Sequence, residues 1–216
     1  MATETLSERI LRENTGVLEE MINHRFVVDI KNDVLSNTVF ERYLVYEGAF
    51  VDTAISIFAF SVAKAQTIEQ KRWLAAVVIA LANDQMAYFE RTFASRRIDP
   101  SSFDTSIPAV KNFCSGMLAI AKDGEFLDII AAMFAAEWMY WTWSKEASAC
   151  NISDPLLKEW VAMHVDQAFA DQATWLKDQL DMAGEQGLPE GLCVRLSSIF
   201  GYAMQLEIDF HDAPYL

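Results

Sequence analysis

The sequence predicts an all-α protein, because three observations agree. Long segments repeat apolar residues with the 3.6-residue period of amphipathic helices, whereas the period-2 alternation of strands is hard to find. Only eight Gly and five Pro interrupt the 216 residues. Hydrophobic residues make up 52% of the chain, enough to form a substantial core. We therefore expect a single-domain helical bundle of about seven helices spanning residues 1–216.

Turn and capping signals divide the expected helices from one another. The R-R-I-D-P-S-S segment around Pro100 is a turn, and Asp123-Gly124 ends one helix before the next begins. Asp154-Pro155 places a capping residue before a proline at the first helical position, and the G-E-Q-G-L-P segment at 184–189 precedes the last helix. In order, the expected helices are 4–23, 36–65, 68–94, 106–122, 124–149, 154–183 and 189–212.

The charge and the apolar stretches of the chain argue against a nucleic-acid partner and a membrane partner. The formal net charge is −14, and no basic stripe compensates it, so the surface repels phosphate backbones and a nucleic-acid partner is not expected. The first residues lack the basic-then-apolar pattern of a signal peptide. The apolar stretches at 75–82 and 129–136 are too short to span a bilayer. We expect a cytoplasmic protein with no membrane partner.

Cysteine and histidine usage argues against the common metal and disulfide frameworks. The three cysteines form no C-x-x-C pair, and no Glu-x-x-His pair of the di-iron type occurs. A carboxylate-only metal site stays open, but we expect no metal and no cofactor. The cysteines are Cys114, Cys150 and Cys193.

A carboxylate inside an aromatic run is the strongest candidate for chemistry. Residues 131–145 read A-A-M-F-A-A-E-W-M-Y-W-T-W-S-K, and Glu137 is their only acidic residue. In a helix, Ala136, Tyr140 and Trp143 share a stripe, and Glu137 lies beside Tyr140. Small residues leave space, aromatic rings give flat walls and the carboxylate supplies a polar contact, which together suit a flat, polar heterocycle. The same pattern also fits a Glu bonded to a neighbouring Tyr or Trp in an ordinary core.

Three further helical segments place polar groups on apolar faces. Glu47 and Phe50 lie one turn apart, Trp160 and His164 are spaced i, i+4, and Glu207 shares a face with apolar and aromatic residues near the C-terminus. Each has an ordinary alternative: Glu47 is solvated, His164 is a satisfied core histidine, and Glu207 belongs to an acidic helix end.

In this order, the motifs resemble the TenA family of thiamin-salvage enzymes, whose members include thiaminase II. The resemblance covers nearly the whole chain and rests on four segments. They are I-N-H-R-F-V-V-D-I at 22–30, F-E-R-Y-L-V-Y-E-G-A-F at 40–50, A-A-E-W-M-Y at 135–140 and F-H-D-A-P-Y at 210–215. It implies a haem-oxygenase-like fold and self-association as a homo-oligomer, a tetramer or a dimer.

The resemblance also departs from the better-known branch of the family. That branch has Pro-Cys with a Tyr four residues after the cysteine, and counting back from Tyr140 places Ala136 where the thiol should be. The chain is therefore similar to the cysteine-lacking branch, in which a glutamate, here Glu137, follows the vacant position. The same branch has a histidine, here His164, where the cysteine branch has an active-site Tyr.

The resemblance implies a small-molecule pyrimidine as substrate and assigns roles to the candidate residues. Glu207 matches the family's catalytic glutamate, and Glu137 is the second catalytic carboxylate or anchors the substrate amine. Glu47 accepts the ring amino group. The residues expected to line the ring are Phe50, Tyr140, Trp138 and His164, with Phe113 or Cys114 at a further position whose register the sequence leaves open.

The implied activity is that of an aminopyrimidine aminohydrolase. The enzyme would convert aminomethyl or formamidomethyl pyrimidines from thiamin breakdown into the hydroxymethyl pyrimidine without a cysteine. Two other functions stay open: another chemistry on the same fold, as in PqqC-like or haem-binding proteins, for which His24 is a candidate ligand, and a non-catalytic ligand-binding or regulatory protein.

Overall fold

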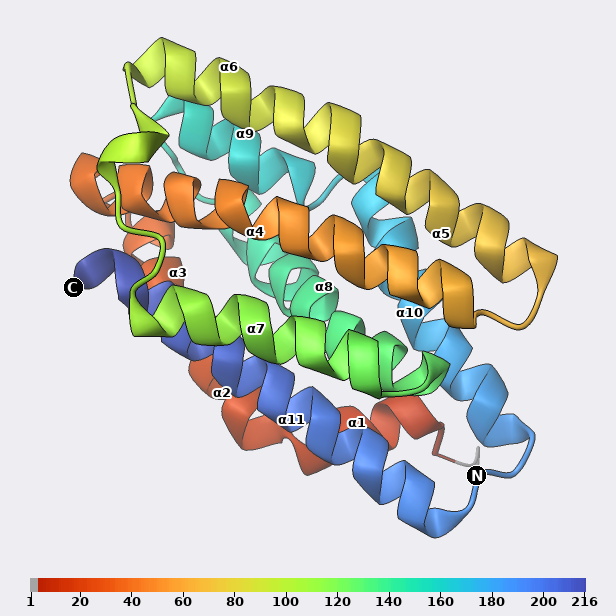
Figure 1. The fold of residues 1–216 in the computed structure, drawn as a ribbon. Coiled ribbons are helices and arrows are strands. Elements are labelled where there is room, and N and C mark those ends of the chain that lie inside the picture. Colours follow the sequence, from red (N-terminus) through yellow and green to blue (C-terminus); the bar gives the residue numbers. More distant parts are fainter. Residues whose placement is uncertain (1–3) are drawn as a thin grey trace. The chain divides into compact units, whose positions relative to one another are not determined.

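The structure, a computed structural model, describes residues 4–216, and within that range it consists of helices and connecting segments with no strand (Figure 1). The all-α prediction is confirmed. Contacts within the chain define two compact units, which are described separately. Unit 1 comprises the chain up to Leu35 together with Ile130–Ile208, and unit 2 comprises Ser36–Ile129 with Asp209–Leu216.

Unit 2 is built around its longest helix, α4. This helix lies between the α5–η1–α6 rod and α7, and it contacts all of these elements as well as η3 (Figure 1). The elements are α4 (Asn37–Lys64), α5 (Ile68–Ala80), the π-helical η1 (Leu81–Gln85), α6 (Met86–Arg96), the 3-10 helix η2 (Pro100–Ser102), α7 (Pro108–Asp123) and the 3-10 helix η3 (Ala213–Tyr215).

Local sequence signals explain where these helices begin and end. Ser36 accepts a hydrogen bond from the Val39 amide at the start of α4, and Thr67 and Gln70 form a capping box at the start of α5. Arg97 ends α6 in the left-handed conformation, with φ of 58°. Pro108 begins α7, where its missing N–H removes no helical hydrogen bond.

Unit 1 contains α1 (Leu6–Glu13), α2 (Thr15–Ile22), α3 (Arg25–Lys31), α9 (Pro155–Met163), α10 (Gln167–Glu185) and most of α8 (Phe126–Ser148) and α11 (Glu190–Asp212). The Ser7 amide and hydroxyl donate to Asp181, which joins α1 to α10. Phe134 of α8 packs on Phe200 of α11 at 5.5 Å between ring centroids. Aromatic contacts of this kind form the core of the unit.

Three of the expected long helices are divided and α3 was not expected, so the described residues form more helices than the seven predicted. The 68–94 segment is divided into α5 and α6 by the π-helical η1. The 4–23 segment breaks at Asn14, whose side-chain amide donates to the carbonyl oxygens of Ile10 and Ser197. The 154–183 segment breaks after His164, because Asp166 accepts a hydrogen bond from the Phe169 amide and starts α10. The breaks at Asn14 and after His164 depend on polar side chains that a hydrophobic period does not reveal.

One described helix, α4, is long and apolar enough to cross a membrane by length and composition alone. The sequence-based search for long apolar stretches did not single it out. Half of its most apolar 18-residue window is buried in the fold, as in the core helix of a globular protein.

Candidate functional site

Glu137 is a buried carboxyl group in unit 1. It lies in the middle of α8 and is 9% exposed. Its Oε1 accepts a 2.9 Å hydrogen bond from the Gln172 side-chain amide on α10. Burial raises the pKa of Glu137 to about 7, against the opposing effect of the Gln172 hydrogen bond. Near neutral pH both protonation states are therefore populated, which suits a group that takes up and releases protons.

His164 lies in an aromatic cluster of the same unit. Its ring stacks on Tyr140 with 4.8 Å between centroids and meets Trp160 and Phe169 edge-on at 4.2 and 4.7 Å. Burial lowers its pKa to about 4, so the ring is neutral at neutral pH. Nδ1 lies 2.8 Å from the Trp160 carbonyl oxygen, which can only accept, so Nδ1 carries the proton. Nε2 is consequently left as a hydrogen-bond acceptor.

The two polar groups belong to one arrangement of helices. Glu137 and Tyr140 are three residues apart on α8, and Phe169 and Gln172 are three residues apart on α10. Gln172 donates a hydrogen bond to Glu137, and the His164 ring contacts the rings of both Tyr140 and Phe169. Three of the predicted residues, Glu137, Tyr140 and His164, are therefore connected through contacts between α8, α10 and the end of α9.

Trp138 and Glu207 are the other residues of unit 1 predicted for the site. Trp138 packs on Phe134 and Trp141 of its own helix, with ring centroids at 5.2 and 5.0 Å. At 100° per residue it is roughly 160° from Tyr140 around the α8 axis. Glu207 is on α11 and is fully buried. A buried carboxylate is uncommon without a partner or a function, and its place in the reaction stays a prediction.

In unit 2 the predicted residues Glu47 and Phe50 are both buried on α4. The Phe50 ring packs on Phe113 at 4.3 Å, and Phe113 packs on Phe210 at 4.6 Å. The register that the sequence left open therefore places Phe113, on α7, against Phe50. Three aromatic rings from three segments therefore pack against one another at tilted angles in this unit.

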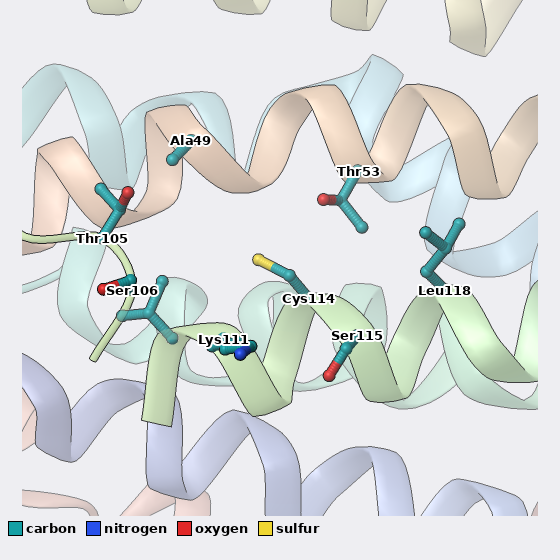
Figure 2. A pocket seen from close by; sticks show the side chains of 9 residues that line it. Ala49, Thr53, Thr105, Ser106, Lys111, Cys114, Ser115 and Leu118 are labelled. Carbon is teal, nitrogen blue, oxygen red and sulfur yellow. The ribbon is translucent and has the colours of Figure 1, made fainter. Parts of the chain in front are cut away.

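Cys114 faces a separate cavity of about 520 Å³ between α4 and α7. Figure 2 shows its side chain between the two helices, across from Ala49 and Thr53, with Thr105 and Ser106 on the loop that precedes α7. Burial raises the pKa of the Cys114 thiol, against a hydrogen bond with Thr53, so the reactive thiolate is disfavoured there. None of the three cysteines occupies the position of Ala136.

Sequence reasoning missed Gln172, Phe169 and Phe210. Gln172 and Phe169 share a face of α10 at i, i+3, a signal of the same kind as the one that identified Glu137 and Tyr140. Phe210 stands only in the F-H-D-A-P-Y segment of the family resemblance, where it has no assigned role. Within residues 4–216, no group of three or more His, Cys, Asp or Glu side chains is arranged to hold a metal ion.

The fold places the chain in the haem-oxygenase-like class of all-α proteins. A protein of that fold from Shewanella denitrificans superposes with a TM-score of 0.74 at 10% identity, covering 96% of this chain and 90% of that one. A TenA homologue from Pyrococcus furiosus superposes with a TM-score of 0.89 at 21% identity, covering 97% of this chain and 100% of that one.

Sequence comparison then identifies the family. Residues 12–215 match the model of the TENA/THI-4/PQQC family, so the chain belongs to that family. An aminopyrimidine aminohydrolase from Halalkalibacterium halodurans is 26% identical over 204 residues, 92% of this chain and 90% of the relative. Another from Helicobacter pylori is 21% identical over 217 residues, 97% of this chain and 98% of the relative.

Proposed function

We propose that this protein hydrolyses the exocyclic C–N bond of aminomethyl or formamidomethyl pyrimidines derived from thiamin, giving the hydroxymethyl pyrimidine. The observation that carries the proposal is Glu137, a buried carboxyl group with a pKa near 7 that is held by Gln172 beside an aromatic cluster. The names of the relatives from Halalkalibacterium halodurans and Helicobacter pylori support the same reaction.

The reaction needs one base and one acid. A carboxylate removes a proton from water, whose oxygen forms a bond to the exocyclic methylene carbon. The C–N bond breaks, and a protonated carboxyl group gives its proton to the departing nitrogen, which leaves as ammonia from the aminomethyl substrate. Glu207 and Glu137 are the two carboxyl groups that we assign to these steps. No thiol takes part, because Ala136 has no nucleophilic atom.

The remaining predicted residues bind the pyrimidine. Glu47 accepts hydrogen bonds from the ring amino group, and Phe50 and Tyr140 cover the faces of the ring. His164 presents Nε2 as an acceptor, since its Nδ1 donates to Trp160. Trp138, which packs on Phe134 and Trp141, is assigned to the same site.

Direct assay of turnover tests the proposal. The purified protein is incubated with the aminomethyl and formamidomethyl pyrimidines, and the hydroxymethyl product is quantified. Glu207→Gln keeps the size of the side chain but cannot exchange a proton, so turnover should fall by roughly 100-fold or more. Glu69→Gln, at an exposed position in the first turn of α5, is the control and should match the parent. Equal turnover in these two folded variants would refute the mechanism, and ligand binding without turnover in the parent would favour a binding protein.

Three further properties belong to the same proposal. The protein acts in the cytoplasm, functions as one domain over residues 1–216, and self-associates as a dimer or tetramer. Long helices that leave apolar side chains exposed, among them Ile68 and Ile79 on α5, support self-association.

A further inference from the structure

A second cavity of unit 2 contains none of the residues assigned to the pyrimidine. Its volume is about 480 Å³, within the range of small-molecule sites. The segment that leads from η2 into α7 runs beside the first turns of α4 (Figure 1) and forms one side of it. Apolar walls come from Phe103, Ile107, Pro108, Ala213 and Leu216, and the polar lining from Arg42, Tyr46, Ser102 and Asp104.

Arg42 supplies a cation to this cavity. One guanidinium nitrogen donates a 3.1 Å hydrogen bond to the Pro214 carbonyl oxygen, which anchors the side chain between α4 and η3. No carboxylate in residues 4–216 forms an ion pair with Arg42, although the chain has 31 acidic residues against 17 basic ones. Several guanidinium N–H donors are therefore available to a ligand.

Tyr46 supplies a hydroxyl group one helical turn away. It is spaced i, i+4 from Arg42, so both side chains lie on one face of α4. Tyr46 is 6% exposed, and its hydroxyl makes no hydrogen bond with any residue of the described chain. A tyrosine hydroxyl that lines the cavity and has no partner in the described chain can donate a hydrogen bond to an oxygen atom of a ligand.

Asp104 is the one acidic side chain among the residues that line the cavity. Oδ1 of Asp104 accepts hydrogen bonds from the Ser106 amide at 2.9 Å and the Ser106 hydroxyl at 2.6 Å. Both bonds lie within its own loop and involve one of its two carboxylate oxygens. Arg42 is the one cationic side chain among the lining residues and forms no ion pair in the described chain, which favours a ligand with a negatively charged group.

We propose that this cavity binds a small organic anion, whose oxyanion contacts Arg42 and Tyr46 while its apolar body packs against Phe103 and Ile107. A carboxylate and a phosphate monoester share this chemistry. An arginine fork and a phenol hydroxyl both donate to such oxygens. This site goes beyond the hydrolase proposal and does not depend on it.

Isothermal titration calorimetry with benzoate, benzamide and benzamidine tests the sign of the charge, because the three molecules have nearly the same shape. Benzoate should bind at least tenfold more tightly than the other two, and more weakly as salt is added. Phenyl phosphate distinguishes the two ligand classes. If it binds more tightly than benzoate, the site prefers a phosphate monoester, and if benzoate binds more tightly, the site prefers a carboxylate. Benzamide or benzamidine binding as tightly as the anions, or neither anion binding with a Kd below about 1 mM, overturns the proposal.

Variants locate the site. Arg42→Gln should weaken anion binding at least tenfold and Tyr46→Phe severalfold, whereas Arg72→Gln on α5 serves as the control for loss of one positive charge. Arg42→Lys keeps the positive charge but loses the bidentate guanidinium donors, so its affinity for the anion should lie between those of the parent and Arg42→Gln. This variant keeps the test valid if Arg42→Gln fails to fold. Glu207→Gln should bind the anion as the parent does. Full affinity in folded Arg42→Gln and Arg42→Lys, or loss of affinity in Glu207→Gln, places the anion elsewhere and overturns the proposal.

Discussion

Glu137 on α8 accepts a 2.9 Å hydrogen bond from Gln172 on α10, and this bond opposes the effect of burial on the carboxyl group. Burial alone disfavours the ionised form, and an N–H donor stabilises it. The balance leaves the pKa of Glu137 about 7, close to the pH at which an acid–base group works best. Gln172 is thus a positioning residue that acts through Glu137.

Removing the donor should shift the pH dependence of hydrolysis. Gln172→Leu deletes the bond that favours the ionised carboxylate, so the pKa of Glu137 should rise further, by about one unit. The inflection in the pH profile of kcat that corresponds to ionisation of Glu137 should therefore move to higher pH. Gln167→Leu, an exposed residue on the same helix, is the control. A profile of Gln172→Leu that overlays the parent would show that Glu137 does not titrate in the reaction.

Glu137 and His164 should make opposite contributions to the pH dependence of stability. The folded pKa of Glu137 is raised from 4.5 to about 7, so the folded state holds a proton that the unfolded state releases, and stability increases as pH falls through this window. The folded pKa of His164 is lowered from 6.5 to about 4, so the unfolded state takes up the proton first, and stability decreases as pH falls. Each contribution is about 3 kcal/mol, and they largely cancel in the parent.

Single variants should separate these contributions. In Glu137→Gln only the destabilising histidine contribution remains, so the free energy of unfolding should fall by up to about 3 kcal/mol relative to the parent between pH 7 and 4.5. His164→Asn should show the opposite difference. Denaturant titrations across that range measure both. Parallel pH dependences in parent and Glu137→Gln would contradict the raised pKa.

The sequence predicts elements whose cause is local. Asp154 caps α9 before Pro155, and α7 ends at Asp123 before Gly124, as their residue types indicate. The stripe of Tyr140 and Trp143 is also found, with ring centroids 5.7 Å apart. In these cases the determining atoms lie within one or two turns of one another along the chain.

Features that depend on distant residues were missed for a physical reason. The break at Asn14 depends on its bond to Ser197, 183 residues away, and the partner of Glu137 is 35 residues away. Hydrophobic periodicity describes one helix at a time and contains no information on which polar groups meet across helices. The cavity beside Arg42 likewise forms from three separate segments.

Catalysis should not require a thiol. The triple variant Cys114→Ser, Cys150→Ser, Cys193→Ser should keep its hydrolytic turnover, because none of these residues stands at the position of Ala136 and the thiolate of Cys114 is disfavoured by burial. The measurement is kcat for the aminomethyl pyrimidine, with circular dichroism to verify folding. Glu137→Gln in the same background is the comparison that should lose activity. A folded triple variant without turnover would mean that a cysteine takes part in the reaction.

The protein should self-associate in solution. Its exposed apolar side chains include Ile79 on α5, which is 61% exposed, and surfaces of this kind are commonly covered in homo-oligomers. Multi-angle light scattering at micromolar concentration should give a mass near two or four times the 24.4 kDa of the chain. A mass of one chain at every concentration tested would exclude the oligomer.

Lys64 should stabilise unit 2 by capping the end of α7. Its ammonium group donates to the carbonyl oxygens of Ala121 at 2.8 Å, Lys122 at 2.9 Å and Gly124. These are the acceptors that a helix leaves unsatisfied at its C-terminus, where the helix dipole also favours a cation. Lys64→Met keeps the aliphatic stem but removes the donors, so the free energy of unfolding should fall by about 1–3 kcal/mol.

The control for this change is Lys71→Met on α5, because Lys71 makes no such contact with α7. Denaturant unfolding of the two variants beside the parent measures the difference. If Lys64→Met is no less stable than Lys71→Met, water satisfies the carbonyl oxygens at the end of α7 equally well, and Lys64 does not contribute to the free energy of unfolding. A loss of stability confined to Lys64→Met would instead show that the end of α4 holds the end of α7 in place.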